Sequence, residues 1–208
     1  MAIISTRPSI GLIKTRWRNK TARRTPEERA GVIGANIWKI AIEIFKHLEK
    51  DGFRFGTDRQ VTSIITEFIA FLVQLTDRTL YGQTSDAERA ALINAVASHL
   101  AKTMENNQLD LLGPGDYRSP FIQTLNDRFG DYAQFEYVER DPGYACLRYF
   151  GNKVSDAMAS SDNKWVIEQI MEMEAPEMVR LIKKLVDEVV AAAISQTGAN
   201  DKDRGSAG

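Results

Sequence analysis

The sequence predicts an all-α protein, a single-domain bundle of six to seven helices. Three observations support this prediction. Apolar residues recur at spacings of three and four through most of the chain, which is the period of a helix with one buried face. Helix-capping sequences precede these stretches, and turn-forming segments separate them. No stretch alternates apolar and polar residues over the length of a strand, and only residues 135–137 favour an extended conformation.

The first helix is expected over residues 25–50. The residues TPEE at positions 25–28 combine an N-cap hydroxyl, a proline at the first helical position and a glutamate that closes a capping box. The residues DG at positions 51–52 can end the helix, because glycine adopts a left-handed cap. Near the start, Gly31 and Gly34 form a GxxG pair, which usually permits a second helix to pack closely.

Two further helices complete the first half. The segment 57–80 opens at a threonine cap and is the most apolar in the chain, so we expect it at the centre of the bundle. Its narrow polar strip, which includes Glu67 and Gln74, should face solvent. The residues SDAE at positions 85–88 form another capping box, and the helix that they open should end near residue 107.

Three helices are expected in the second half, over residues 119–138, 144–159 and 164–195, with glycine, proline or serine breaks between them. Pro176 should kink or restart the last of these helices. The expected helical domain is therefore 25–195. The tail, 196–208, has little to bury and is expected to be disordered.

Charge is divided unevenly along the chain. Residues 1–24 contain seven Lys and Arg and no acid, which leaves 20 of the 27 cations to balance all 28 acids in the rest of the chain. An acidic body thus carries a basic N-terminal arm, expected to be extended or disordered because the first helix has its own cap. The arm residues expected to bind a partner or an anion are Arg16, Trp17, Arg18, Lys20, Arg23 and Arg24.

The composition restricts the compartment. Cys146 is the single cysteine, so no intrachain disulfide can form. The chain has no long uninterrupted apolar run and no secretory signal at its start. We therefore expect a cytoplasmic protein without a transmembrane segment. An arginine- and threonine-rich start without acids also fits a targeting peptide, which leaves the mitochondrial matrix as an alternative.

No catalytic, cofactor-binding or metal-binding motif is found, and we expect neither an enzyme nor a cofactor. The two histidines, His47 and His99, lie at the edges of apolar stripes, and Glu43 with His47 makes at most half a metal site. Cys146 has apolar and aromatic neighbours, which favour a buried, inert thiol. Glu67 could serve as an acid or a gate only if its carboxyl group were buried.

The segment EQIMEMEAPEM at residues 168–178 concentrates glutamates and methionines. One interpretation is an acidic, adaptable docking surface for a basic segment such as the arm of a neighbouring copy. The other is a solvated face with methionines in the core behind it. The glutamates are Glu168, Glu172, Glu174 and Glu177.

These observations favour a non-catalytic interaction or scaffold protein that docks on an acidic protein partner through its basic arm, in a larger assembly or a homo-oligomer. One alternative is a nucleic-acid- or ribosome-associated factor, because alternating cations and tryptophan suit phosphates and stacked bases. The same arm could also contact an anionic membrane surface. A second alternative is a bundle that holds a small apolar ligand between its first three helices.

Overall fold

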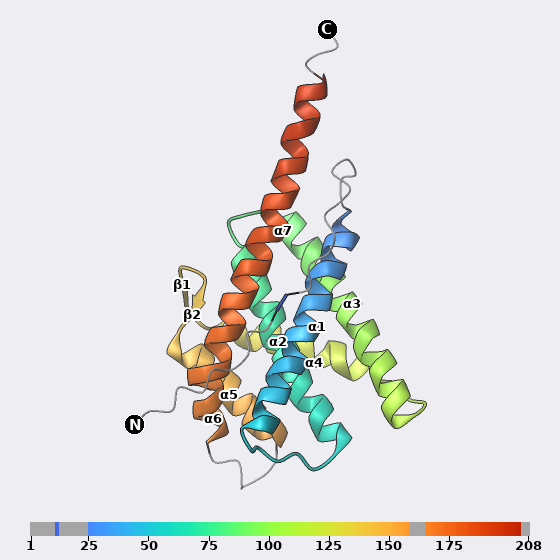
Figure 1. Cartoon of the computed structure of the whole chain (residues 1–208), viewed down its shortest axis with the longest axis vertical. Coiled ribbons are helices and arrows are strands. Elements are labelled where there is room, and N and C mark those ends of the chain that lie inside the picture. Colours follow the sequence, from blue (N-terminus) through green and yellow to red (C-terminus); the bar gives the residue numbers. More distant parts are fainter. Residues whose placement is uncertain (1–10, 13–24, 159–164, 205–208) are drawn as a thin grey trace.

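Six long helices surround one hydrophobic core in the computed structural model, which describes residues 11–12, 25–158 and 165–204. The predicted all-α class is confirmed for these residues. The helices are α1 (Pro26–Lys50), α2 (Asp58–Leu80), α3 (Asp86–Leu112), α4 (Arg118–Tyr132), α5 (Tyr144–Met158) and α7 (Ala175–Arg204), and α7 is preceded by the short α6 (Val166–Gln169) and the π-helical turn η1 (Ile170–Glu174) (Figure 1).

The first three helices begin at the predicted caps. The Thr25 hydroxyl accepts a hydrogen bond from the Glu28 amide, and the Glu28 carboxylate accepts one from the Thr25 amide. Ser85 and Glu88 form the same reciprocal box at the start of α3, and the Thr57 hydroxyl caps α2. Each cap satisfies amide groups that the helix itself leaves without partners, so these boundaries are set locally.

Helix α2 is the central helix, as predicted. Every residue from Ile64 to Thr76 is buried, and α2 contacts α1, α3, α4, α5 and α7. Its Phe71 ring stacks on Phe150 of α5, with 4.0 Å between centroids and 11° between planes. The predicted solvent-facing strip is wrong, because Glu67 and Gln74 are only 6% and 2% exposed. Because other elements surround α2 on all sides, its polar side chains are buried too.

Helix α1 packs most extensively on α3, and Gly34 is the point of close approach. A Cβ atom at Gly34 would lie 2.5 Å from Cδ2 of His99, whereas one at Gly31 would meet no neighbouring atom within 4 Å. The GxxG pair therefore permits close packing through one glycine alone. His99 is exposed to solvent, although its ring covers Gly34.

The boundaries in the second half differ from the predicted ones. Helix α3 continues past residue 107 to Leu112, and α4 ends at Tyr132. A short antiparallel hairpin then pairs β1 (Tyr137–Val138) with β2 (Asp141–Pro142). Its two turn residues, Glu139 and Arg140, have φ angles of 51° and 71°. The extended segment expected at 135–137 thus overlaps the observed strand only at Tyr137.

The predicted kink at Pro176 takes the form of η1. Proline has no amide hydrogen to bond to the carbonyl four residues back, and just before it the Ala175 amide bonds to the carbonyl of Ile170, five residues back. Helix α7 then runs past the predicted end at residue 195 to Arg204, and Figure 1 shows its C-terminal part extending away from the bundle. A helix satisfies its own backbone hydrogen bonds, so this extension does not require apolar residues. Residues 205–208 lie outside the described part.

A candidate docking groove between the first and third helices

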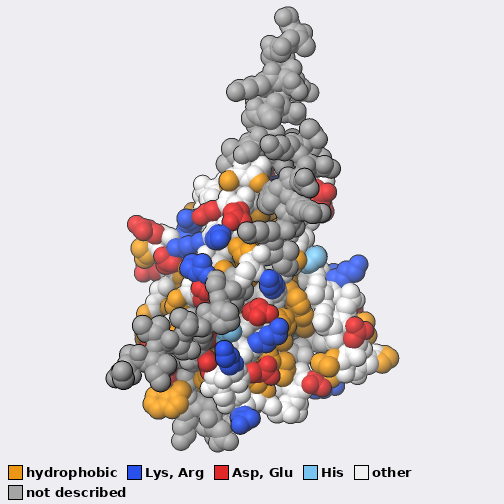
Figure 2. All heavy atoms as spheres, viewed as in Figure 1, with side chains coloured by type: hydrophobic (Ala, Val, Ile, Leu, Met, Phe, Trp, Pro, Cys, Tyr) orange, Lys and Arg blue, Asp and Glu red, His pale blue; other side chains and the backbone are white. Residues whose placement is uncertain are grey.

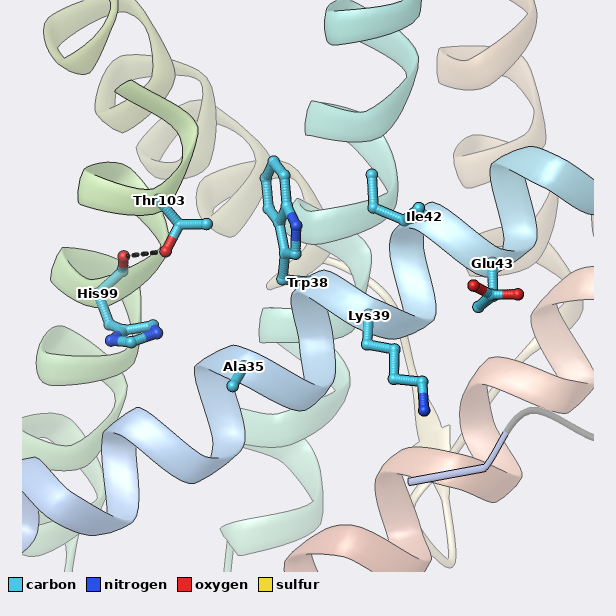
Figure 3. A pocket seen from close by; sticks show the side chains of 7 residues that line it. All are labelled: Ala35, Trp38, Lys39, Ile42, Glu43, His99 and Thr103. Carbon is cyan, nitrogen blue, oxygen red and sulfur yellow. Dashed lines mark hydrogen bonds between the residues drawn. The ribbon is translucent and has the colours of Figure 1, made fainter. Parts of the chain in front are cut away.

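A surface groove of about 400 Å³ lies between α1 and α3. Figure 3 shows its lining side chains: Trp38 projects from α1 on the side of His99 and Thr103, whereas Lys39 projects from α1 in a different direction. In Figure 2, hydrophobic side chains form a band over this part of the molecule, beside acidic and basic groups. The lining residues are Ala35, Trp38, Lys39, Ile42 and Glu43 from α1 and His99 and Thr103 from α3.

The floor of the groove is apolar because two large side chains of α1 point away from the bundle centre. Ile37, Ile40 and Ile44 form the fully buried stripe, and residues one or two positions away turn toward the flank of the helix. Trp38 and Ile42 occupy that flank and are half-buried. Both side chains also pack against the core, so each lies between the core and the groove.

The polar groups at the rim have partners within the protein. The Glu43 carboxylate accepts a hydrogen bond from Lys46 at 2.9 Å, and the Thr103 hydroxyl donates one to the backbone carbonyl of His99 at 3.0 Å. Because these polar groups already have partners, the apolar surface of Trp38 and Ile42 is the main feature that a binding partner would cover.

Two residues near the middle of the N-terminal arm, Gly11 and Leu12, contact the body beside this groove. Nζ of Lys39 donates a 2.5 Å hydrogen bond to the carbonyl of Gly11, and Leu12 packs against the hydrophobic core. These two arm residues contact the body, which the sequence did not predict. The predicted binding residues of the arm lie outside the described residues: Arg16, Trp17, Arg18, Lys20, Arg23 and Arg24.

The four glutamates of the predicted acidic surface do not share one environment. Glu168 and Glu172 are exposed. Glu177 forms two hydrogen bonds with the Arg180 guanidinium, at 2.8 and 2.6 Å. Glu174 is 1% exposed, so it is not available at a docking surface.

The burial of Glu174 follows from its position on the helix. It comes four residues after the buried Ile170, on the inward face. One carboxylate oxygen accepts a 3.0 Å hydrogen bond from Gln169, and the other lies 3.5 Å from Nδ1 of His47. The acid that His47 faces is therefore Glu174 rather than Glu43. Among the described residues, no group of three or more His, Cys, Asp or Glu side chains is arranged to hold a metal ion.

Glu67 forms a buried ion pair that the sequence did not predict. Its two carboxylate oxygens accept hydrogen bonds from Nε and Nη2 of Arg128 on α4, each at 2.7 Å. These hydrogen bonds raise the pKa of Arg128 above its ordinary value. Arg128 also contacts Asp131, which accepts a hydrogen bond from Tyr149. Glu67 thus joins two helices.

A sequence signal for this pair existed on α4. Phe121, Leu125 and Tyr132 mark the buried face of that helix, and Arg128 falls between the last two at spacings of three and four. A cation on the inward face of a helix needs a buried acid. Glu67, an acid on the most apolar helix, was the candidate partner for Arg128.

Cys146 is a buried thiol, as predicted. Its Sγ lies 3.3 Å from the Tyr137 hydroxyl, and burial raises the pKa of both groups. The nearby Tyr132 hydroxyl is buried without a hydrogen-bond partner among the described residues, and burial raises its pKa as well. A thiol that remains protonated is a poor nucleophile.

The described residues form an all-α bundle with a largely apolar groove between α1 and α3. Comparison with protein-family models, with curated proteins and with solved structures finds no match to this chain. None of the described helices combines the length and the apolar character that crossing a membrane requires.

Proposed function

We propose that this protein is a non-catalytic interaction protein that binds an acidic, amphipathic helix of a protein partner. The groove between α1 and α3 takes the apolar side chains of that helix, and the basic arm takes its acidic residues. The observation that carries the proposal is the position of Lys39, which lines the groove and also bonds to Gly11 near the middle of the arm.

The groove supports an apolar contact. Half-buried tryptophan is among the residues that contribute most to protein interfaces, and Trp38 lies next to Ile42 one helical turn away. The space is open along two neighbouring helices (Figure 3). A third helix can lay its apolar face along such a groove, with anchors at spacings of three and four.

The arm supports an acidic partner. It has seven cations and no acid, and it joins a body in which acids outnumber bases. Because the Lys39–Gly11 hydrogen bond holds the arm beside the groove at residue 11, one partner helix can engage both elements. Two linked contacts bind more tightly than either alone, since the second forms within the complex.

Quantitative affinity capture tests this proposal with the full chain as bait. Trp38→Ala removes the anchor, and Ala35→Phe fills the groove without removing any core contact. We expect both variants, and a chain lacking residues 1–24, to lose the same set of captured proteins. The matched control is Leu111→Ala, which removes an exposed leucine at the far end of α3. Circular dichroism checks that each variant folds.

Three outcomes contradict the proposal. Capture that is unchanged by Trp38→Ala and Ala35→Phe rules out the groove. Capture that nuclease treatment abolishes indicates nucleic acid as the partner. A bound small molecule in native mass spectra of the full chain, absent from Trp38→Ala, indicates an apolar ligand in the groove.

A further inference from the structure

A second exposed surface lies on α6 and η1. Trp165 and Met173 are 75% and 50% exposed, and Glu168 and Glu172 between them are also exposed. We call these four residues the Trp165 face. Hydrophobic atoms protrude over α6 in Figure 2. A tryptophan so fully in contact with water is unusual for a side chain of this size.

The Trp165 face is held outward by the packing behind it. Residues at 165, 168, 172 and 173 follow helical spacing, and the opposite side consists of the buried Val166 and Ile170. Gln169 adds a hydrogen bond of 3.0 Å to Asp51 at the end of α1. The face is therefore a fixed part of the bundle surface.

Two carboxylates give the Trp165 face negative charge. Neither Glu168 nor Glu172 forms an ion pair with another described residue, whereas Glu177 further along is paired with Arg180. Two carboxylates beside an exposed tryptophan and a methionine fit a segment that alternates cations with apolar residues. Arginine also stacks on the face of a tryptophan ring, and methionine adapts to irregular partners.

We propose that the Trp165 face binds the basic arm, residues 1–24, of a second copy of this chain. The inference rests on the proposed function in one respect, which is that the arm is a binding element for acidic surfaces. The arm supplies alternating cations and apolar residues at positions 16–18, and no acid that would be repelled. Charge complementarity thus selects the arm as the occupant.

The length of the arm favours a second copy over the same chain. Six of its seven cations lie between Leu12, next to the Lys39 contact, and the cap at Thr25. From Lys39 to Thr25 is about 21 Å along α1, at 1.5 Å per residue. The Trp165 face adjoins the other end of α1, where Gln169 bonds to Asp51, and Lys50 at that end is about 16 Å beyond Lys39 at the same rise.

A segment that visited this face and returned to Thr25 would therefore have to cover about 16 and then 37 Å along α1. The 13 residue steps from Leu12 to Thr25 span only about 45 Å when fully extended, at about 3.5 Å each. A second copy has no such restriction. Reciprocal exchange of arms closes a two-fold dimer. Once the first arm has bound, the second arm binds within the same complex, which strengthens the dimer.

Sedimentation velocity of the full chain tests this inference. We expect a monomer–dimer equilibrium between about 1 and 100 μM, a range that detects micromolar affinity, and weaker association at high salt. The face variant Glu168→Lys/Glu172→Lys should be monomeric, as should the arm variant Arg16→Glu/Arg18→Glu/Lys20→Glu. Because the reversed arm matches the reversed face, an equimolar mixture of the two variants should dimerise again.

The matched control is Asp110→Lys/Asp127→Lys, which changes the net charge equally at exposed positions away from α6 and should still dimerise. A full chain that stays monomeric at every concentration overturns the inference, as does a mixture of the two variants that stays monomeric. The groove variant Trp38→Ala separates the two proposals, since it should lose captured partners but keep the dimer. Loss of the dimer in Trp38→Ala alone would assign self-association to the groove and contradict the inference.

Discussion

The carboxylate of Glu67 accepts two hydrogen bonds from the guanidinium of Arg128, each at 2.7 Å, and joins the central helix α2 to α4. The two residues are 61 positions apart in the sequence. Both side chains are largely buried, with 8% and 18% of their surfaces exposed. This pair fixes how the second half of the chain packs on the first.

Removing one partner of this pair should destabilise the fold strongly. We expect Glu67→Gln to lower the free energy of unfolding by about 3 kcal/mol, because it leaves a largely buried guanidinium without its counter-charge. The double variant Glu67→Leu/Arg128→Leu should lose less than the single one. Urea denaturation measures both. The exposed pair Glu43–Lys46 provides the control, where Glu43→Gln should cost no more than about 0.5 kcal/mol. Equal losses at the two sites would contradict a structural role for Glu67.

Stability should decline at alkaline pH. Burial raises the pKa of the Cys146 thiol and of the Tyr132 hydroxyl. Between the unfolded and the folded pKa, the native state therefore binds more protons than the unfolded state, so the free energy of unfolding falls as pH rises. The fall should begin near pH 8.5, where an unfolded cysteine titrates. Urea midpoints from pH 7 upward measure it. In Cys146→Ala the fall should begin only near pH 10, where tyrosine titrates. An unchanged onset would show that the thiol titrates normally in the folded protein.

The two glycines of α1 should respond differently to alanine. Gly31→Ala meets no neighbour and should stabilise the protein by about 0.5–1 kcal/mol, because alanine favours the helix. Gly34→Ala places its Cβ against His99 and should be less stable than Gly31→Ala by about 1 kcal/mol or more. Thermal unfolding compares them. Adding His99→Ala to Gly34→Ala should recover the difference, and no recovery would mean that backbone contacts set the spacing of α1 and α3.

The hairpin turn should gain stability from glycine. Arg140 has a φ of 71°, a conformation that costs a non-glycine residue about 1 kcal/mol. Its ion pair with Asp187 is substantially exposed, and such pairs contribute little. Arg140→Gly should therefore raise the unfolding midpoint in urea, whereas Arg140→Ala, which keeps the strain and loses the pair, should not. A midpoint raised equally by alanine would indicate that the turn is unstrained.

The sequence predicted those features that depend on neighbouring residues. The caps at Thr25, Thr57 and Ser85 are set by side chains within three positions of the helix start, and the local pattern was sufficient to find them. Pro176 likewise predicted a departure from the α-helix, because the missing amide hydrogen is a property of that residue alone.

Features that depend on distant partners were beyond the sequence pattern. The sequence pattern placed Glu67 and Glu174 at the surface. Their partners, Arg128 and His47, lie far away in the sequence, so the local pattern does not show these contacts. The partial exposure of Trp38 and Ile42 is of the same kind, because hydrophobicity does not reveal which apolar side chains the neighbouring helices leave uncovered. The groove therefore emerged only from the packing of α1 on α3.

Site-specific photo-crosslinking from position 35 tests the central claim most directly. A photoreactive residue that replaces Ala35 lies in the groove. One that replaces Leu111, an exposed residue of α3 that does not line the groove, serves as the control. The account predicts crosslinks from position 35 to one partner segment that is acidic and has apolar residues at helical spacing, and none from position 111 to that segment. Equal crosslinking from both positions, or crosslinks from position 35 to segments without acidic residues, would contradict it.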